Sequence, residues 1–332
     1  MILSNTFIFV DRLSNFRVSM RHLVYGANAK RPEHRAICNV KPRDIVFIYV
    51  MEQRSLYGPF VAIQRMFESD EDIGWKLDGR PANWPHRVPL RPWSPKLGVL
   101  RGPGLLELFS SLRSSLLTIK DISDLHRRYL NTLLLDEARE LLNAFIEQCS
   151  WLDPREIISD FGTHPHRGQP VDAATLLRRY STRSRVPEYL VELFLLQNIG
   201  SLEELVGAHI SEVYNQVYVY QDRFLDILTI HRYGERIMKA TVIEVKAQLS
   251  EKALEAAAEE LCHYMYSIAS ILPEARGRTF GVLLTPPTSR RGAVKAFELR
   301  LDRVTQLYGL NREKITWVQY NHRRGMEFSI VG

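Results

Sequence analysis

The chain has 332 residues and a formal net charge of +6, and its 45% hydrophobic content is enough for two domains with hydrophobic cores. No apolar run reaches the roughly 18 residues of a membrane span, and residues 1–10 lack a basic segment before a long apolar core. We therefore expect a soluble, cytoplasmic protein with no membrane partner; its three widely separated cysteines argue against a disulfide framework or a zinc site.

The charge is unevenly distributed along the chain. Residues 1–104 contain 16 Lys and Arg and 9 Asp and Glu, a net charge of +7, whereas the rest of the chain sums to −1. A basic domain attached to a near-neutral one indicates that the first part binds a polyanion. A solubilising surface charge explains the same excess equally well.

The N-terminal part of the chain shows strand patterns and one helix pattern. Residues 6–11 alternate apolar and polar positions, and residues 15–25 place apolar and basic side chains at helical spacing. A turn at 41–44 leads into an apolar strand at 45–50, and another strand follows at 56–63. Several strands with one helix near the start predict a small mixed β-barrel.

The order of these motifs resembles the EVE and YTH-like branch of the PUA superfamily. The resemblance rests on residues 41–49, 56–63 and 84–90, and it covers most of residues 1–115. Members of this branch bind nucleic acid and often hold a modified base in an aromatic cage. The resemblance therefore implies a base-recognition domain at 1–115, without catalytic residues.

Aromatic and basic side chains of this domain are candidates for holding a base taken out of a duplex, which needs π-faces for stacking and cations for its phosphates. They are Tyr57, Trp75, Trp84 and Trp93 for the base, and Arg87 and Arg91 for phosphates. Trp75 and Trp84 lie in a polar, loop-like stretch and are the better candidates. Because a tryptophan in a small barrel usually belongs to the core, we expect only one or two of the four aromatic residues to line a pocket.

Residues 104–149 change to a leucine-rich helical pattern, with apolar positions at 105–112 and 130–146. We interpret 116–170 as a helical connector and linker that packs on a domain or on a second protomer, which would allow a homodimer. Its Pro- and Gly-containing end contains His164 and His166, which we interpret as loop residues because a metal site needs further ligands. The arginines at 178–185 either contact phosphates or form a solvated helix end.

Residues 171–332 predict a second domain that contains both helices and strands. Helix patterns occupy 187–194, 250–271 and 293–308, and strand patterns occupy 212–220, 224–230, 239–246, 279–285, 315–320 and 326–331. The polar, glycine-containing segment 231–236 joins two of these strands as a hairpin.

The two strands of this hairpin carry charged residues among apolar ones: Asp226 in the first, Glu244 and Lys246 in the second. An ionised carboxylate in a buried strand loses several kcal/mol of solvation unless a metal or a hydrogen-bonded partner compensates it. Residues i and i+2 of a strand share a face, so Glu244 and Lys246 lie side by side, and the hairpin brings Asp226 near Glu244. Two carboxylates and a lysine predict a divalent-metal site of the hard-oxygen type.

Asp226 followed by Glu244-Val245-Lys246 resembles the D…(D/E)-X-K signature of the PD-(D/E)XK nuclease superfamily. The order of helix, three-strand meander, helix and strand also agrees with the core of that superfamily. The resemblance implies that Asp226, Glu244 and the Val245 carbonyl hold Mg²⁺ or Mn²⁺, and that Lys246 assists the attacking water. The expected fold class is therefore α/β (α+β): a PUA-like mixed barrel, a helical connector, and a restriction-endonuclease-like α/β/α sandwich with a mixed sheet at 171–332.

Three further carboxylates flank this motif. Glu188 and Glu192 lie on the preceding helix, where members of the superfamily often add a carboxylate. Glu260 begins the sequence Glu-Leu-Cys-His-Tyr on the following helix, where NucS-like members have Gln-Leu-X-X-Tyr. With glutamate in place of glutamine, position 260 either contacts the metal's outer shell or marks a lost activity.

Together these features predict a metal-dependent DNA endonuclease whose N-terminal domain reads a modified, flipped base, as restriction of modified DNA requires. Repair or mismatch cleavage is a second setting for the same chemistry. The alternative from another class is a non-cleaving reader of nucleic acid, including RNA, with a degenerate nuclease fold. The simplest interpretation of the motif is a salt bridge in which Lys246 neutralises Glu244, with no metal dependence.

Overall fold

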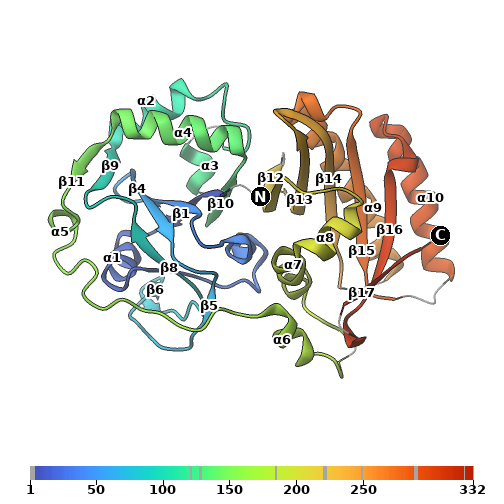
Figure 1. Ribbon diagram of the computed structural model, residues 1–332, viewed down its shortest axis with the longest axis horizontal. Coiled ribbons are helices and arrows are strands. Elements are labelled where there is room, and N and C mark those ends of the chain that lie inside the picture. Colours follow the sequence, from blue (N-terminus) through green and yellow to red (C-terminus); the bar gives the residue numbers. More distant parts are fainter. Residues whose placement is uncertain are drawn as a thin grey trace. The chain divides into compact units, whose positions relative to one another are not determined.

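The computed structural model describes residues 4–119, 122–126, 129–183, 185–219, 223–247, 250–287, 291–324 and 326–331. They form a mixed α/β protein (Figure 1) that divides into two compact units, with the boundary between Val171 and Asp172. We call residues 4–171 the N-terminal unit and residues 172–331 the C-terminal unit. No helix in the described part of the chain is long and apolar enough to cross a membrane.

The N-terminal unit is built on a sheet that curls into a half-barrel, with the main strand order β10-β1-β3-β4-β8-β2. The strands are β1 (Thr6–Asp11), β2 (Val24–Ala27), β3 (Ile45–Val50), β4 (Ser55–Ala62), β5 (Phe67–Glu68), β8 (His86–Pro92), β9 (Leu97–Arg101), β10 (Leu130–Leu133) and β11 (Ser150–Leu152). A separate two-stranded sheet pairs β6 (Lys76–Leu77) with β7 (Arg80–Pro81). The strands expected at 6–11 and 45–50 are confirmed, and β4 lies one residue before the expected 56–63.

The helices of this unit include those of the region that was expected as a separate connector. They are α1 (Leu13–His22), α2 (Gly102–Ser111), α3 (Ile122–His126), α4 (Leu135–Gln148), α5 (Pro154–Ile157) and the 3-10 helix η1 (Pro32–Asn39). Leu108 of α2 and Phe145 of α4 are fully buried in one core with Phe47 and Leu56 of the sheet. The region expected as a connector at 116–170 is therefore part of the N-terminal unit, and these side chains face its core instead of a second protomer.

Residues 130–133 differ from the expected helix. They form the strand β10, which pairs antiparallel with β1 and places Leu133 opposite Thr6. The leucines of this stretch are compatible with a helix face and with a buried strand. The strand forms because the edge of β1 offers backbone hydrogen bonds to it.

The C-terminal unit contains a mixed sheet in the order β12-β13-β14-β15-β16-β17. The strands are β12 (Glu212–Val219), β13 (Arg223–Tyr233), β14 (Arg236–Val245), β15 (Thr279–Thr285), β16 (Ile315–Asn321) and β17 (Glu327–Ile330). β14, β15 and β16 are parallel to one another, and the other neighbouring pairs are antiparallel. All six strand predictions are confirmed to within three residues at each end; Tyr220, the expected last residue of the first strand, lies outside the described residues.

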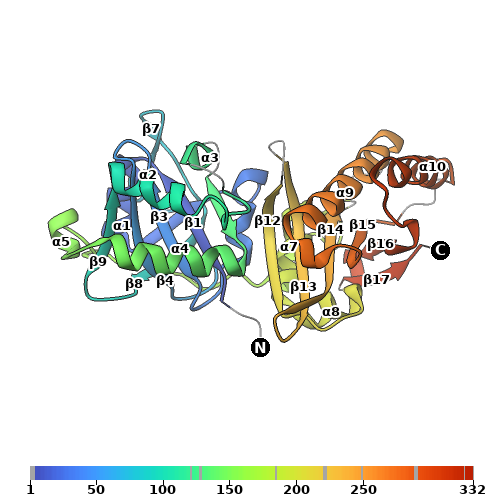
Figure 2. The same cartoon turned by 90° about the horizontal axis from the view of Figure 1, so that it is seen from above.

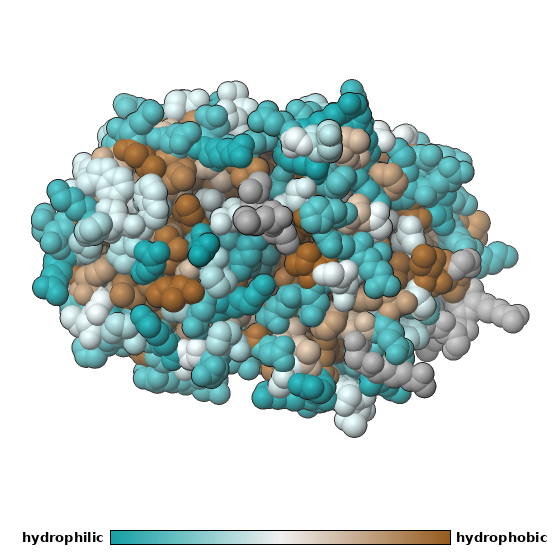
Figure 3. All heavy atoms as spheres, viewed as in Figure 1, coloured by the Kyte–Doolittle hydropathy of each residue, from teal (hydrophilic) through white to brown (hydrophobic). Residues whose placement is uncertain are grey.

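The helices of the C-terminal unit are α6 (Ala173–Arg178), α7 (Glu188–Gln197), α8 (Ile199–Val206), α9 (Glu251–Ile271) and α10 (Arg291–Tyr308), with the short 3-10 helices η2 (Pro273–Ala275), η3 (Arg312–Lys314) and η4 (His322–Arg324). α9 packs on β14 and β15, α10 packs on α9, and α7 contacts β14 (Figure 2). On the molecular face in Figure 3, hydrophilic side chains predominate and hydrophobic ones appear in patches between them.

The expected hairpin is the pair β13–β14. Its turn contains Gly234 and Glu235, with Tyr233 opposite Arg236, and Gly234 has the positive φ of +60° that glycine adopts without strain. A β-bulge between His231 and Arg232 shifts the register by one residue, so that Ile227 lies opposite Ile243 near the other ends of the strands. Asp226 and Glu244 each lie one residue further from the turn than this pair, so the hairpin brings them to neighbouring positions.

Candidate functional site

The end of β14 collects carboxylates from three other elements. The main-chain N–H of Val245 donates to Oδ2 of Asp226 on β13 at 2.8 Å. The N–H of Ala247 donates to Oε1 of Glu188, in the first turn of α7, at 3.1 Å. Main-chain donors thus fix two candidate acids on either side of Lys246.

Lys246 is held between two further carboxylates. Its Nζ lies 2.6 Å from Oε1 of Glu244 and 2.7 Å from Oε2 of Glu260 on α9. Burial lowers the pKa of Lys246, but the charges of Glu244, Asp226 and Glu260 outweigh burial and raise this pKa well above its usual range. Lys246 therefore remains an ammonium ion at any physiological pH.

Glu244 is the least compensated acid of the group. Its side chain is buried, and its Oε2 has no hydrogen-bond partner among the described residues. Burial raises the pKa of Glu244 to about 7, against the opposing charge of Lys246. A buried carboxylate oxygen without a donor is costly, and a bound cation is one way to compensate it.

Two amides of β12 connect Asp226 with the sixth candidate, Glu192 of α7, which is fully buried. Gln216 Nε2 donates to Asp226 Oδ1 at 3.0 Å and to Glu192 Oε2 at 3.2 Å. Asn215 Nδ2 donates to the same Glu192 oxygen at 2.8 Å and to the Asp226 carbonyl at 2.7 Å. The structure thus brings all six expected residues, Glu188, Glu192, Asp226, Glu244, Lys246 and Glu260, into one network.

Gln216 has a strained backbone inside a strand. Its φ of +54° lies in the left-handed region, which is uncommon for a residue other than glycine. Sequence reasoning missed Asn215 and Gln216, although two adjacent polar residues in an alternating strand must place one of them on the buried face. That signal identifies a polar contact in the interior but does not name its partner.

The donor atoms around β14 suit a hard cation. Among the described residues, no three His, Cys, Asp or Glu side chains converge into a ready-made metal site. The expected ligand set contains only two side-chain carboxylates, Asp226 and Glu244, together with the Val245 carbonyl. Oxygen donors of this kind and the donor-free Oε2 of Glu244 fit Mg²⁺ or Mn²⁺.

The N-terminal unit has a polar pocket of about 40 Å³, which Trp75 and Trp84 line together with Asp11 and Ser19. Trp75 Nε1 donates to Ser19 Oγ at 3.1 Å, and this hydroxyl lies 3.3 Å from Oδ2 of Asp11. Burial raises the pKa of Asp11 to about 8, so its carboxyl group is largely protonated at pH 7. Sequence reasoning missed Asp11, although a carboxylate that ends a buried strand is the same kind of signal as Asp226.

Two of the four aromatic candidates, Tyr57 and Trp93, do not line this pocket. Tyr57 is a core residue: its ring lies 4.5 Å from that of Phe16, and its hydroxyl donates to Gln53 Oε1 at 2.6 Å. Trp93 is 46% exposed on the turn after β8. Arg91 is exposed nearby, with Nη1 3.4 Å from the Pro92 carbonyl.

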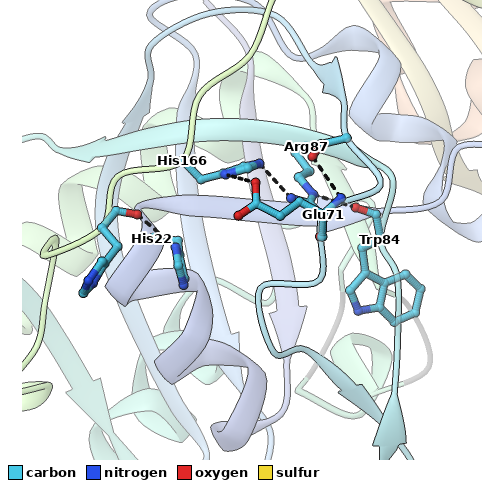
Figure 4. Close-up of polar contacts among 7 residues, drawn as sticks. His22, Glu71, Trp84, Arg87 and His166 are labelled. Carbon is cyan, nitrogen blue, oxygen red and sulfur yellow. Dashed lines mark hydrogen bonds and ion pairs between the residues drawn. The ribbon is translucent and has the colours of Figure 1, made fainter.

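Arg87 is a structural residue, which corrects its expected role as a phosphate contact. It is fully buried. Its Nε donates to the Trp84 carbonyl at 3.0 Å, and its guanidinium carbon lies 5.1 Å from the centre of the Trp75 ring. Its Nη1 lies 2.7 Å from Nε2 of His166, whose Nδ1 is 3.4 Å from Glu71 Oε2 (Figure 4). A guanidinium enclosed in this way contacts both tryptophans and does not reach solvent.

The histidines of the segment after α5 hold that segment against α1 of the same unit. His22 Nδ1 lies 2.9 Å from the His164 carbonyl (Figure 4). The N–H of His166 donates to the His22 carbonyl at 2.8 Å. The second contact satisfies the His22 carbonyl at the end of α1, which has no partner within the helix.

No protein-family model matches the chain, and no curated protein matches its sequence.

Proposed function

We propose that the C-terminal unit is a divalent-metal-dependent DNA endonuclease of the PD-(D/E)XK type. The observation that carries the proposal is the buried Glu244 carboxylate beside Asp226 on the neighbouring strand: one of its oxygens contacts Lys246, and the other has no donor in the part of the chain that the structure describes. A salt bridge alone would require neither the second carboxylate nor the buried oxygen without a partner.

Each residue has a distinct role in this proposal. Asp226, Glu244 and the Val245 carbonyl hold Mg²⁺ or Mn²⁺, which when bound polarises the scissile phosphate and lowers the pKa of a water. Lys246 remains protonated and stabilises the negative charge that develops on the phosphate. Glu192, Gln216 and Asn215 orient Asp226, and Glu188 fixes the chain after Lys246.

We further propose that the N-terminal unit is a PUA-superfamily-like domain that reads a modified base. Trp75 and Trp84 supply aromatic surface at the pocket, and the protonated carboxyl of Asp11 both donates and accepts hydrogen bonds, as recognition of a base edge requires. In this arrangement the first unit selects DNA and the second cleaves it, as in restriction of modified DNA.

The test uses the full chain with Mg²⁺ or Mn²⁺ and matched plasmids that differ only in base modification. We expect cleavage of a modified plasmid, and we expect Asp226→Asn, Glu244→Ala and Lys246→Ala each to abolish it while DNA affinity stays within several-fold of wild type. Glu235→Ala, an exposed site on the same hairpin, is the matched control. Cleavage that persists in EDTA, or full activity of Glu244→Ala, would exclude this site.

A non-cleaving reader of nucleic acid is the second candidate, and Glu260 is the residue that favours it. Its carboxylate lies 2.7 Å from Lys246 Nζ and competes with a phosphate for the same ammonium group. If Glu260 only lies in the metal's outer shell, Glu260→Gln keeps at least partial cleavage. If the site is degenerate, wild type and Glu260→Gln both bind nucleic acid and neither cleaves it with any divalent metal.

A further inference from the structure

An open groove of about 600 Å³ lies on the N-terminal unit. Its lining includes Asn28, Arg31, Leu77, Arg80 and Trp84. The volume is in the range of small-molecule binding sites, roughly 300–1,000 Å³.

The groove and the polar pocket described above share a wall. Leu77 and Trp84 line both of them. The pocket, at about 40 Å³, has room for only a few water-sized groups, so it suits the polar edge of a ring and not a whole nucleotide. The groove supplies the space that the remaining part of such a ligand needs.

The charge of the groove favours an anion. Arg31 and Arg80 are both exposed, and neither forms an ion pair with any described residue. The acid in the same groove, Asp78, is already paired with Arg12, whose Nη2 lies 3.1 Å from Asp78 Oδ1. Each guanidinium is a planar fork of donors that matches phosphate oxygens, and both line the same groove beside a neutralised acid.

Two residues contact Trp84, which lines both the groove and the pocket. Arg87 fixes the Trp84 carbonyl, and the His34 ring lies 5.3 Å from the Trp84 ring (Figure 4 shows the contact to Arg87). Arg80 follows the turn at Asp78 and Gly79, in which Gly79 has a φ of +78°. This turn joins β6 to β7 and places Arg80 at the start of β7, where it lines the groove.

We propose that this groove binds the sugar-phosphate of a single nucleotide, with its phosphate on Arg31 and Arg80 and its base edge in the adjoining pocket. The inference rests on the base-reading role proposed above and adds the form of the ligand. Because the base leaves its stack to enter the pocket, the N-terminal unit is expected to prefer a single-stranded or flipped nucleotide to an intact duplex.

The test measures binding of a labelled single-stranded oligonucleotide, plain or modified, to the full chain by fluorescence anisotropy between 50 and 200 mM salt. Arg31→Gln and Arg80→Gln are each expected to weaken binding roughly tenfold. Each is also expected to reduce the salt slope by about 0.7. The loss should be equal for plain and modified oligonucleotides, since phosphates carry no base identity. Arg113→Gln, an exposed arginine of the same unit outside the groove, is the matched control and should bind as wild type does.

The outcomes separate this inference from the base-reading role. Normal wild-type binding with unchanged affinity and salt slope in Arg31→Gln and Arg80→Gln refutes the groove alone. If wild type binds no oligonucleotide, the base-reading role fails and the groove with it. Competition by a nucleoside monophosphate as strong as that by the oligonucleotide would assign the groove to a free nucleotide and overturn the nucleic-acid ligand.

Discussion

Replacing Glu244 by glutamine should change how the stability of the protein depends on pH. Burial raises the pKa of Glu244 from 4.5 to about 7. Between these values the folded state binds more protons than the unfolded state, so this residue makes the free energy of unfolding fall as pH rises. Glutamine has nearly the same shape and does not titrate, so Glu244→Gln removes that dependence.

The size of the effect follows from the shift. One pKa unit corresponds to about 1.4 kcal/mol, and integration from pH 5 to pH 8 gives a wild-type loss of about 2 to 3 kcal/mol. The side chain is only 3% exposed, so solvent screens its charge little. Wild type and Glu244→Gln should therefore be similarly stable near pH 5, and the variant should be more stable by that amount at pH 8.

The measurement is urea-induced unfolding of the full chain from pH 5 to pH 8 in EDTA. Glu260→Gln is the matched control, because it makes the same chemical change at the other contact of Lys246, on a side chain that is 30% exposed. With Mg²⁺ in place of EDTA, wild type should gain stability at pH 8, whereas Glu244→Gln should gain little. Equal pH slopes in wild type and Glu244→Gln, or an equal flattening in Glu260→Gln, would refute the reasoning.

Three further substitutions test the two sites. Gln216→Glu adds a third acid beside Glu192 and Asp226, so urea unfolding at pH 8 should show a loss of about 2–4 kcal/mol that diminishes at pH 5; unchanged stability would contradict the network. Gly26→Ala places a Cβ that overlaps Cη2 of Trp75 and lies 2.7 Å from Cβ of Trp84. It should lower the free energy of unfolding by about 1–3 kcal/mol and weaken discrimination between modified and plain oligonucleotides. Gly200→Ala, with open space around it, should do neither. Burial, the charge of Arg87 and the nearby His22 lower the pKa of His166 below 6.5 against the opposing charge of Glu71. The contribution of neutral His166 to the free energy of unfolding is therefore present above pH 6.5 and is lost as pH falls below it. Thermal unfolding of His166→Gln should show a weaker acid destabilisation than wild type, and an identical pH profile would count against the contact with Arg87.

Local patterns were sufficient for most secondary structure and for the carboxylate network. The apolar runs around Asp226 and Glu244 identify strands because alternation and β-branched content are properties of the chain alone. The same runs identify the charged residues within them as unusual, since a carboxylate inside a buried strand requires compensation wherever the strand lies. The turn at Gly234 joins the two strands, and the β-bulge between His231 and Arg232 then determines which of their residues meet.

Tertiary structure decided what the apolar faces and the polar side chains contact. The leucine pattern of α2 and α4 shows that each helix has a buried face, but only the fold shows that the face packs on the strands of its own unit. Arg87 has the sequence signature of a phosphate contact, yet contacts from Trp84, Trp75 and His166, as far as 79 residues away, enclose it.

The partners of Asp226 show the same division between sequence and fold. Its own strand pattern marks it as a buried acid, whereas its donors, Gln216 and Val245, come from two neighbouring strands and depend on register. Arg31 and Arg80 meet at one groove although 49 positions separate them in sequence. Periodicity records whether a side chain is buried, because burial repeats with the geometry of one element; it does not record which distant side chain lies opposite, because that depends on how the elements pack.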